Sequence, residues 1–323
     1  MISNDFLSIR DFTPEELTEF IELARLIKTS PELFNDSLKG QTLALIFEKP
    51  SLRTRVSFDV GIHQLGGHAI YLSPSEINLG KRESVEDVGK NLERMVQGIM
   101  IRTFSHEIVE QMAEWTHVPV INGLTDFSHP CQALADYLTI LECKEEVRGK
   151  RIAYIGDGNN VAHSLLFCGI QLGASVRIAT PPGYEPNDEA VRWAKDHSGL
   201  TGGSFLLTHD PAEAASGADV IYTDVWTSMG QEDEQAERSV LFRPYQVDAS
   251  LLRLAKPDVT FMHCLPAHRG DEVTAEVIDG LHSVVYQQAE NRVHAQKAIM
   301  VELMKHAVVD SLRSVVFHLP LHV

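Results

Sequence analysis

The sequence of 323 residues is short of positive charge and of long apolar runs. Only 28 lysines and arginines face 45 aspartates and glutamates, which leaves a formal net charge of −17 at pH 7. So acidic a chain repels nucleic-acid phosphates and anionic lipids, and we expect neither nucleic acid nor a membrane as partner. No run approaches the ~18 apolar residues of a membrane-spanning helix, and the polar segment 1–12 is unlike a signal peptide. The sequence predicts a cytoplasmic protein.

Cysteine is also scarce. The four cysteines, at positions 131, 143, 168 and 264, form no C-x-x-C pair, which argues against a disulfide framework and against a structural zinc knuckle. Fifteen histidines are present, but most stand alone in the sequence. We therefore expect a reduced compartment, no metal and no organic cofactor.

Short β-rich runs alternate with amphipathic helical stretches along nearly the whole chain, which is typical of α/β proteins with parallel sheets. A chain of this length usually divides into two domains. We expect two, each a mostly parallel sheet flanked by helices, the second Rossmann-like, with the boundary in the charged segment 144–150. The predicted strands are Thr42–Phe47, Ala69–Leu72, Ile99–Arg102, Val118–Ile121, Arg151–Ile155, Ser175–Ala179, Phe205–Leu207, Val220–Asp224, Val259–His263 and Val284–Gln287.

A candidate phosphate-binding segment follows the first predicted strand. Ser51-Leu52-Arg53-Thr54-Arg55 opens a helix, whose free N–H groups and partial positive charge favour an anion. Arg53 and Arg55 point to nearly opposite sides of a helix, so only one of them can face the anion while the other braces the structure. An ordinary serine N-cap beside two surface arginines fits the segment equally well.

Two further polar groups are expected at the carboxyl ends of strands in the first half, where open parallel sheets bind their ligands. Arg102 ends a predicted strand and could neutralise an anionic or carbonyl oxygen. His129 and Gln132 share one side of a helix start and could hydrogen-bond the oxygen and the amide of a small ligand. For His129, a helix-capping role is the alternative.

The second half begins with a turn that resembles a dinucleotide-binding fingerprint. After Gly156 and Gly158, however, Val161 takes the place of the third glycine, so the fingerprint is incomplete. Asn159 and Asn160 indicate a ligand held by amides instead.

Two strands of the second half end in groups that suit an amine substrate. Asp224 ends one strand and can pair with a cationic amine; the acidic segment Gln231–Glu237 that follows is predicted to be a solvated loop. Cys264 ends another strand and is a candidate thiolate nucleophile, metal ligand or hydrogen-bonding group, and the Leu265–Pro266 bond is a candidate cis peptide.

Taken together, these motifs resemble the ornithine carbamoyltransferases in order and spacing, from about residue 40 to residue 300. The segments that carry the resemblance are Ser51-Leu52-Arg53-Thr54-Arg55, His129-Pro130-Cys131-Gln132, Asp157-Gly158-Asn159-Asn160, Asp224 with Ser228-Met229-Gly230, His263-Cys264-Leu265-Pro266 and Ala289-Glu290-Asn291-Arg292.

The resemblance implies transfer of the carbamoyl group of carbamoyl phosphate to the side-chain amine of L-ornithine, giving L-citrulline and phosphate. It implies a carbamoyl-phosphate domain over 1–143, an ornithine domain over 144–289, and C-terminal helices over 290–323 that pack back on the first domain. It also implies a homotrimer with active sites near the subunit interfaces, acting in arginine metabolism without a cofactor.

The resemblance also assigns residues to the two substrates. Carbamoyl phosphate would be bound by Ser51, Leu52, Arg53, Thr54, Asn78, Arg102, His129, Gln132, Cys264, Leu265 and Arg292. Ornithine would be bound by Asn160, Asp224, Ser228 and Met229, and the catalytic set would be Asp224, Cys264, Arg102 and His129. Many members carry Thr where this chain has Leu52, and Gln where it has Asn78, so these two positions depart from the pattern.

Three alternatives remain open on sequence alone. A sibling carbamoyltransferase acting on putrescine or N-acetylornithine would keep the carbamoyl-phosphate residues. A NAD-dependent oxidoreductase is suggested by the Rossmann-like half and disfavoured by its incomplete fingerprint. A non-catalytic carbamoyl-phosphate-binding protein is the third. The direction of the reaction, anabolic or catabolic, is not encoded in these motifs.

Overall fold

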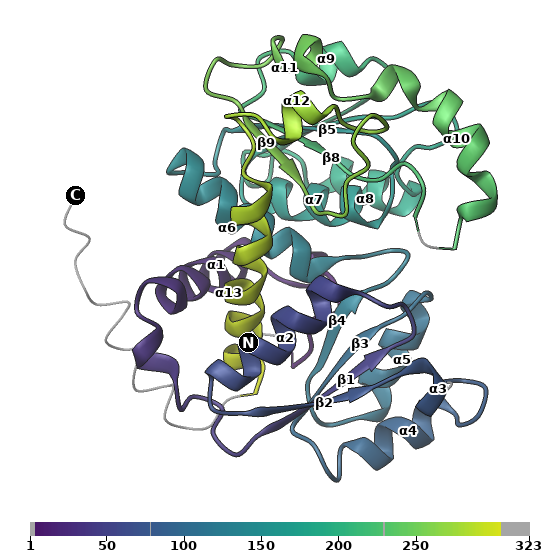
Figure 1. Cartoon of the computed structure of the whole chain (residues 1–323). Helices are drawn as coiled ribbons and strands as arrows, with labels where there is room; N and C mark the ends of the chain where they lie inside the picture. The colour runs from purple at the N-terminus through teal and green to yellow at the C-terminus, as the bar shows by residue number, and fades with distance from the viewer. Residues whose placement is uncertain (1–3, 78, 229, 305–323) are drawn as a thin grey trace.

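The computed structural model describes residues 4–77, 79–228 and 230–304, which form two stacked α/β domains (Figure 1). The first contains a four-stranded sheet in the order β2-β1-β3-β4, all parallel. Its strands are β1 (Thr42–Phe47), β2 (His68–Leu72), β3 (Gly98–Arg102) and β4 (Val120–Leu124). Its helices are α1 (Pro14–Thr29), α2 (Leu52–Gln64), α3 (Pro74–Ile77), α4 (Val85–Leu92), α5 (His106–Trp115) and α6 (Pro130–Lys144), with 3-10 turns at Ile9–Asp11 and Pro31–Phe34.

The second domain contains a five-stranded parallel sheet in the order β7-β6-β5-β8-β9, the doubly wound arrangement of Rossmann-like folds. Its strands are β5 (Arg151–Ile155), β6 (Ser175–Ala179), β7 (Ser204–Thr208), β8 (Val220–Thr223) and β9 (Thr260–His263). Its helices are α7 (Asn160–Gln171), α8 (Asp188–His197), α9 (Pro211–Ala215), α10 (Gln235–Leu241), α11 (Ala249–Leu252) and α12 (Ala275–Ile278), with 3-10 turns at Glu232–Glu234 and Arg243–Tyr245. The predicted fold class is confirmed.

One long helix connects the domains. α13 (Val285–Leu303) begins beside β9 and runs down onto α6, α1 and α2 of the first domain (Figure 1). The described part of the chain ends just beyond it, so most of the predicted helical segment 290–323 lies outside the described residues. The predicted strand Val284–Gln287 is wrong, because this segment forms the first turn of α13. Its Val-Val-Tyr run has the composition of a strand, and a short apolar run does not distinguish strand from helix.

Side chains along β1 point alternately to the two faces of the sheet, and each face packs against a different set of helices. In β1, Leu43, Leu45 and Phe47 enter the core shared with α1, α2, α6 and α13, whereas Ala44 and Ile46 pack toward α4 and α5 on the opposite face. The shared core extends through α6 and α7 to β5 of the second domain, so one continuous apolar cluster joins the two sheets. This cluster packs the two domains against each other.

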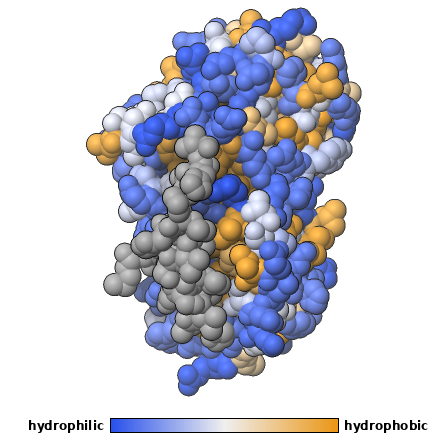
Figure 2. Space-filling view, turned by 90° about the vertical axis from the view of Figure 1, so that its left-hand side faces the viewer, coloured by the Kyte–Doolittle hydropathy of each residue, from blue (hydrophilic) through white to orange (hydrophobic). Residues whose placement is uncertain are grey.

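The visible surface is largely polar. Figure 2 shows a face that is largely hydrophilic, with hydrophobic residues gathered in a few small groups. None of the helices formed by the described residues has both the length and the apolar character needed to cross a membrane.

Candidate active site

A cleft of about 1000 Å³ lies between the domains, and segments that follow strand ends line it from both sides. The first domain contributes Lys49–Arg53 after β1 and Arg102 at the end of β3. The second contributes residues 157–161 after β5, 224–228 after β8 and 264–266 after β9, and α13 contributes Arg292. This is the place at which parallel sheets bind ligands.

The start of α2 forms one wall of the cleft. Ser51 is the N-cap, and its Oγ accepts the main-chain N–H of Thr54 at 3.2 Å. The two arginines separate as predicted: Arg53 Nη2 donates to the Leu265 carbonyl of the other domain at 2.6 Å, and Arg55 lies over the Tyr71 ring at 3.9 Å, away from the cleft.

Two guanidinium groups, those of Arg292 and Arg102, meet at Thr54. Arg292 Nη2 donates to Thr54 Oγ1 at 2.8 Å and Arg102 Nη1 lies 3.5 Å from the same oxygen, while Arg292 Nη1 donates to Gln132 Oε1 at 3.0 Å. Thr54 and Gln132 are buried behind the cleft wall and contact its arginines. The Nε atoms of Arg53, Arg102 and Arg292 are buried without a hydrogen-bond partner in the described protein.

Burial lowers the pKa of all three arginines of this pocket. Burial, together with the neighbouring charges of Arg292 and Arg53, lowers the pKa of Arg102 to about 9. Burial is also the main cause that lowers the pKa of Arg53 and of Arg292. All three remain charged at pH 7, and an anion bound among them relieves their mutual repulsion.

His129 lies beside these cations and is neutral. Burial, and then the charges of Arg292, Arg102 and Arg53, lowers the pKa of His129 well below its usual value. Its main-chain N–H donates to Ser164 Oγ at 2.8 Å, whereas its side-chain Nδ1 has no partner in the described protein. His129 occupies the N-cap position of α6, as the capping alternative expected, but its side chain makes no capping hydrogen bond.

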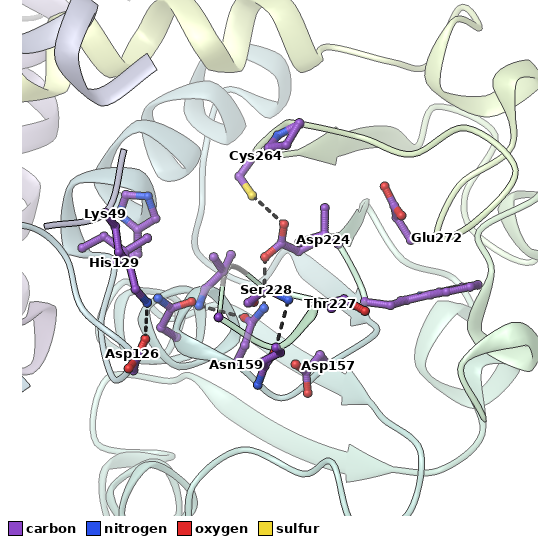
Figure 3. A pocket seen from close by; sticks show the side chains of 18 of the residues that line it. Lys49, Asp126, His129, Asp157, Asn159, Asp224, Thr227, Ser228, Cys264 and Glu272 are labelled. Carbon is purple, nitrogen blue, oxygen red and sulfur yellow. Dashed lines mark hydrogen bonds and ion pairs between the residues drawn. The ribbon is translucent and has the colours of Figure 1, made fainter. Parts of the chain in front are cut away.

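On the other side of the cleft, the Asp224 carboxylate accepts hydrogen bonds from two side chains (Figure 3). Cys264 Sγ donates to Asp224 Oδ1 at 2.9 Å, and Asn159 Nδ2 donates to Asp224 Oδ2 at 3.0 Å. Burial, and then the Asp224 charge, raises the pKa of Cys264 well above that of an ordinary thiol. Of the three possibilities for Cys264, the geometry favours a protonated, hydrogen-bonding thiol over a thiolate nucleophile.

Asn159 also binds main-chain N–H groups at the start of α7. It is the N-cap, and its Oδ1 accepts the N–H groups of Val161 and Ala162. These are the donors that a dinucleotide pyrophosphate would need, so the geometry disfavours the NAD alternative. Asn160 lines the cleft and donates to the Thr125 carbonyl of the first domain.

One group of potential metal ligands occurs among the described residues: Asp224, His263 and Cys264. Their ligand atoms are already engaged. His263 Nδ1 accepts the Leu265 N–H at 2.9 Å, His263 Nε2 lies 3.1 Å from Glu272 Oε1, and the thiol is bonded to Asp224. With both imidazole nitrogens committed, this group does not fit a metal site.

Other predicted residues differ in how they reach the cleft. Leu52 lines it and is 75% exposed; because its side chain is apolar, only its main chain can form a hydrogen bond with a ligand. Leu265 lines the cleft in a left-handed conformation (φ 59°), and the Leu265–Pro266 bond is cis, as predicted.

The residues predicted to bind the acceptor include Ser228, which lines the cleft and donates its N–H to Gln231 Oε1 at 3.1 Å. Asn78 and Met229 lie outside the described residues.

Two charged pairs in the cleft were not predicted from the sequence. Lys49, 4% exposed, pairs with Asp126 (Figure 3) and lies 4.1 Å from the centre of the Phe104 ring. Arg238 Nη1 donates to Asp157 Oδ2 at 2.9 Å and to the Trp226 carbonyl at 2.9 Å. The position of Lys49 next to the phosphate motif could have suggested a role.

The surroundings of Arg238 also correct a prediction. The segment Gln231–Glu237 is not a plain loop, because it contains a 3-10 turn (Glu232–Glu234) and the start of α10, which the buried Arg238 holds against the cleft wall. Its acidic composition resembles that of a solvated loop, and the buried partners of Arg238 are distant in sequence.

Comparison with known proteins gives a consistent result. Residues 4–142 match the family model described as "Aspartate/ornithine carbamoyltransferase, carbamoyl-P binding domain", and residues 148–303 match "Aspartate/ornithine carbamoyltransferase, Asp/Orn binding domain". A protein of Thermococcus kodakarensis named ornithine carbamoyltransferase is 54% identical over 306 residues, covering 94% of this chain and 97% of its own length. A Pyrococcus furiosus protein named "Ornithine carbamoyltransferase, anabolic" is 53% identical with the same coverage.

Solved structures agree. The ornithine carbamoyltransferase of Pyrococcus furiosus superposes with a TM-score of 0.90 at 53% identity, covering 93% of this chain and 96% of its own. That of Thermus thermophilus superposes with a TM-score of 0.85 at 45% identity, covering 94% and 100%. The two family models match both domains, and the relatives cover nearly the full length of the chain. The chain therefore belongs to the aspartate/ornithine carbamoyltransferase family.

Proposed function

We propose that this protein is an ornithine carbamoyltransferase, which converts carbamoyl phosphate and L-ornithine to L-citrulline and phosphate in arginine biosynthesis. One observation carries the proposal: a single cleft joins a cationic pocket at the start of α2 to the Asp224–Cys264 pair. The first suits a phosphorylated donor and the second an amine acceptor. The family matches and the names of the relatives support the same reaction.

In this proposal the first domain binds the donor. The phosphate lies at the start of α2, where Ser51, Arg53 and Thr54 offer N–H and O–H groups and a guanidinium. Arg102, His129 and Arg292 face the carbamoyl oxygen, and Gln132 and the Cys264 and Leu265 carbonyls face the carbamoyl amide. The main chain of Leu52 takes part as an N–H donor, which its exposed side chain leaves unhindered. We also assign Asn78 to carbamoyl phosphate; this residue lies outside the described residues.

The second domain binds the acceptor, through Asn160, Asp224, Ser228 and Met229. The reacting amine resembles that of lysine, with a pKa near 10.4, so only about one molecule in 2,500 is neutral at pH 7 and the handicap is ~4.6 kcal/mol. A carboxylate such as Asp224 is too weak a base to remove the proton outright. Asp224 and the protonated Cys264 therefore aim the amine, while the cationic pocket lowers the pKa of the amine.

Attack by the neutral amine on the carbamoyl carbon creates negative charge on the carbamoyl oxygen. Arg102, His129 and Arg292 are the groups positioned to donate to it, and one such donor contributes ~3–4 kcal/mol. Because His129 is neutral, it donates through one ring nitrogen only. The C–O bond to phosphate then breaks, and the departing phosphate remains at the start of α2 and accepts the proton of the amine.

The test is citrulline formation by purified, chelator-treated protein supplied with carbamoyl phosphate and, separately, L-ornithine, putrescine or N-acetylornithine. We expect product from ornithine alone and no binding of NAD by calorimetry. Product from putrescine or N-acetylornithine instead would identify a sibling carbamoyltransferase. Absence of product from all three amines would contradict carbamoyl transfer.

We also propose that the active form is a homotrimer with the cleft near a subunit interface. Leu52, Val56 and Val60 follow one another at four-residue spacing on α2 and are 75%, 47% and 39% exposed. Ile70, 43% exposed, lies on β2, which is the edge strand of its sheet. Apolar residues gathered at an edge suit a subunit contact, and Leu52 belongs both to this surface and to the cleft.

Light scattering measures the assembly directly. We expect a mass three times the 36.0 kDa of the chain, and a monomeric, inactive product from Val56→Glu. The matched control, Leu33→Glu, changes another exposed apolar residue and should leave the trimer intact. A monomeric wild-type protein with full activity would contradict this assignment.

A further inference from the structure

Behind the cleft, α6 buries a carboxylate that the proposed mechanism does not use. Asp136 is fully buried and lies one helical turn after Gln132. Three donors from three elements meet on it. Gln132 Nε2 on α6 and Gln288 Nε2 on α13 lie 2.8 and 2.7 Å from Oδ1, and the Tyr222 hydroxyl on β8 lies 3.1 Å from Oδ2.

This carboxylate fixes which way the Gln132 amide faces. Because Asp136 Oδ1 accepts the hydrogen bond of Gln132 Nε2, the nitrogen of the amide points toward Asp136 and the oxygen points away from it. The oxygen then faces Arg292 Nη1 at 3.0 Å. Arg292 Nη2 in turn donates to Thr54 at the start of α2. The orientation of one buried amide therefore reaches the cationic pocket through two hydrogen bonds.

The other two partners of Asp136 belong to the acceptor side. Tyr222 precedes Asp224 by two residues on β8, and Gln288 Nε2 is also 3.1 Å from the Tyr222 hydroxyl. Gln288 Oε1 accepts the main-chain N–H of His263, the residue before Cys264, at 2.9 Å. Figure 1 shows α6 and α13 meeting where the two domains join. One carboxylate thus connects both halves of the cleft.

We propose that Asp136 is a positioning residue for carbamoyl phosphate: it holds the Gln132 oxygen toward Arg292 and the carbamoyl amide. The inference rests on the proposed function. Stability of the fold does not explain why a carboxylate is buried at position 136, because burying a carboxylate is costly. Burial raises the pKa of Asp136 to about 7 despite its three hydrogen-bond donors. An apolar residue would fill the same space at lower cost, but it would leave the Gln132 amide free to rotate.

The experiment compares three single variants in steady-state assays and thermal melts. Asp136→Ala removes the acceptor, and Asp136→Asn keeps an acceptor oxygen without the charge. Thr139→Val is the matched control, because it removes a different buried hydrogen bond between α6 and α13, the 2.9 Å contact from Asn291 Nδ2 to Thr139 Oγ1. Where Asp136→Ala does not accumulate as folded protein, Asp136→Ser replaces it.

We expect Asp136→Ala to raise the KM for carbamoyl phosphate at least ~10-fold, the effect of losing one hydrogen bond to a charged group, with a smaller change in the KM for ornithine. Asp136→Asn should recover most of this loss, and Thr139→Val should lower the melting temperature with KM unchanged. In the Gln132→Ala background, adding Asp136→Ala should change KM little further, because the connection to the substrate is already broken.

Three results would overturn the proposal. They are an unchanged KM in folded Asp136→Ala, an equal rise in KM for the Ala and Asn variants, and an equal rise for Thr139→Val, which would mean general loosening. Failure of the wild-type protein to form citrulline would instead refute the proposed function, so the two failures are distinguishable.

Discussion

Asp136→Asn should make the protein more stable, and the gain should depend on pH. Burial raises the pKa of Asp136 from 3.8 to about 7 in the folded protein. Between these values the folded state binds more protons than the unfolded state, so its stability falls as the pH rises from about 4 to 7. Asparagine keeps an acceptor oxygen and has no charge to bury, so this loss is absent in the variant.

The size of the effect follows from the shift in pKa. About three pKa units at ~1.36 kcal/mol each give a penalty of ~4 kcal/mol above pH 7, and the roughly one unit between 3.8 and pH 5 gives ~1–2 kcal/mol there. For a chain of 323 residues, the entropy of unfolding is ~0.7 kcal/mol/K. Asp136→Asn should therefore melt ~6 °C above the wild-type protein at pH 8.5, but only ~2 °C above it at pH 5.

Differential scanning calorimetry at the two pH values measures this difference. The wild-type protein in each buffer is the reference, so the titration of all other groups cancels. An increase of the same size at both pH values would mean that packing, and not ionisation, causes it. A decrease at pH 8.5 would show that Asp136 is ionised at no net cost, and would refute the reasoning from burial.

Three further predictions concern the cleft. Arg53→Ala should raise the KM for carbamoyl phosphate by ~10- to 150-fold, the range for losing a hydrogen bond to a charged group. The control Arg55→Ala should leave this KM unchanged, because the Arg55 side chain lies over Tyr71. Equal effects of the two variants in initial-rate assays would contradict this division of roles. Asp224→Ala should lower kcat with ornithine at least ~100-fold and leave calorimetric binding of carbamoyl phosphate intact; a loss of both would place Asp224 in the donor site instead. Inorganic phosphate at 100 times its Kd should stabilise the protein by ~2.7 kcal/mol in thermal melts, and the same effect in Arg53→Ala would mean that the phosphate binds elsewhere.

Much of the fold was predictable because its signals are local. The strands Thr42–Phe47, Arg151–Ile155 and Ser175–Ala179 have the predicted bounds, since each is a short β-rich run between turn residues. The predicted strand Val118–Ile121 ends too early because Asn122-Gly123 resembles a turn, whereas β4 spans Val120–Leu124. In the structure Gly123 lies inside the strand, where a Cβ atom would be only 2.4 Å from Met100 Sδ. Close packing between strands, which the sequence does not display, decides that position.

The site was predictable where chemistry follows a strand end and was missed where partners are distant in sequence. Arg102, Asp224 and Cys264 stand at or just after strand ends, so their place in the cleft follows from sheet topology. Asp136 carries no such signal, because it lies mid-helix and its importance depends on Tyr222 and Gln288, 86 and 152 residues further along the chain.

The path of α13 has a consequence for how this protein is made. The helix returns from the second domain to the first, and it supplies Arg292 to a pocket whose other walls are built from residues 51 to 132. A ribosome that has completed both sheets has therefore still not completed the anion pocket. The pocket gains its third guanidinium only after residue 292 has emerged, so the pocket is completed late in synthesis. For the same reason neither sheet domain, expressed without α13, would be a working half of the enzyme.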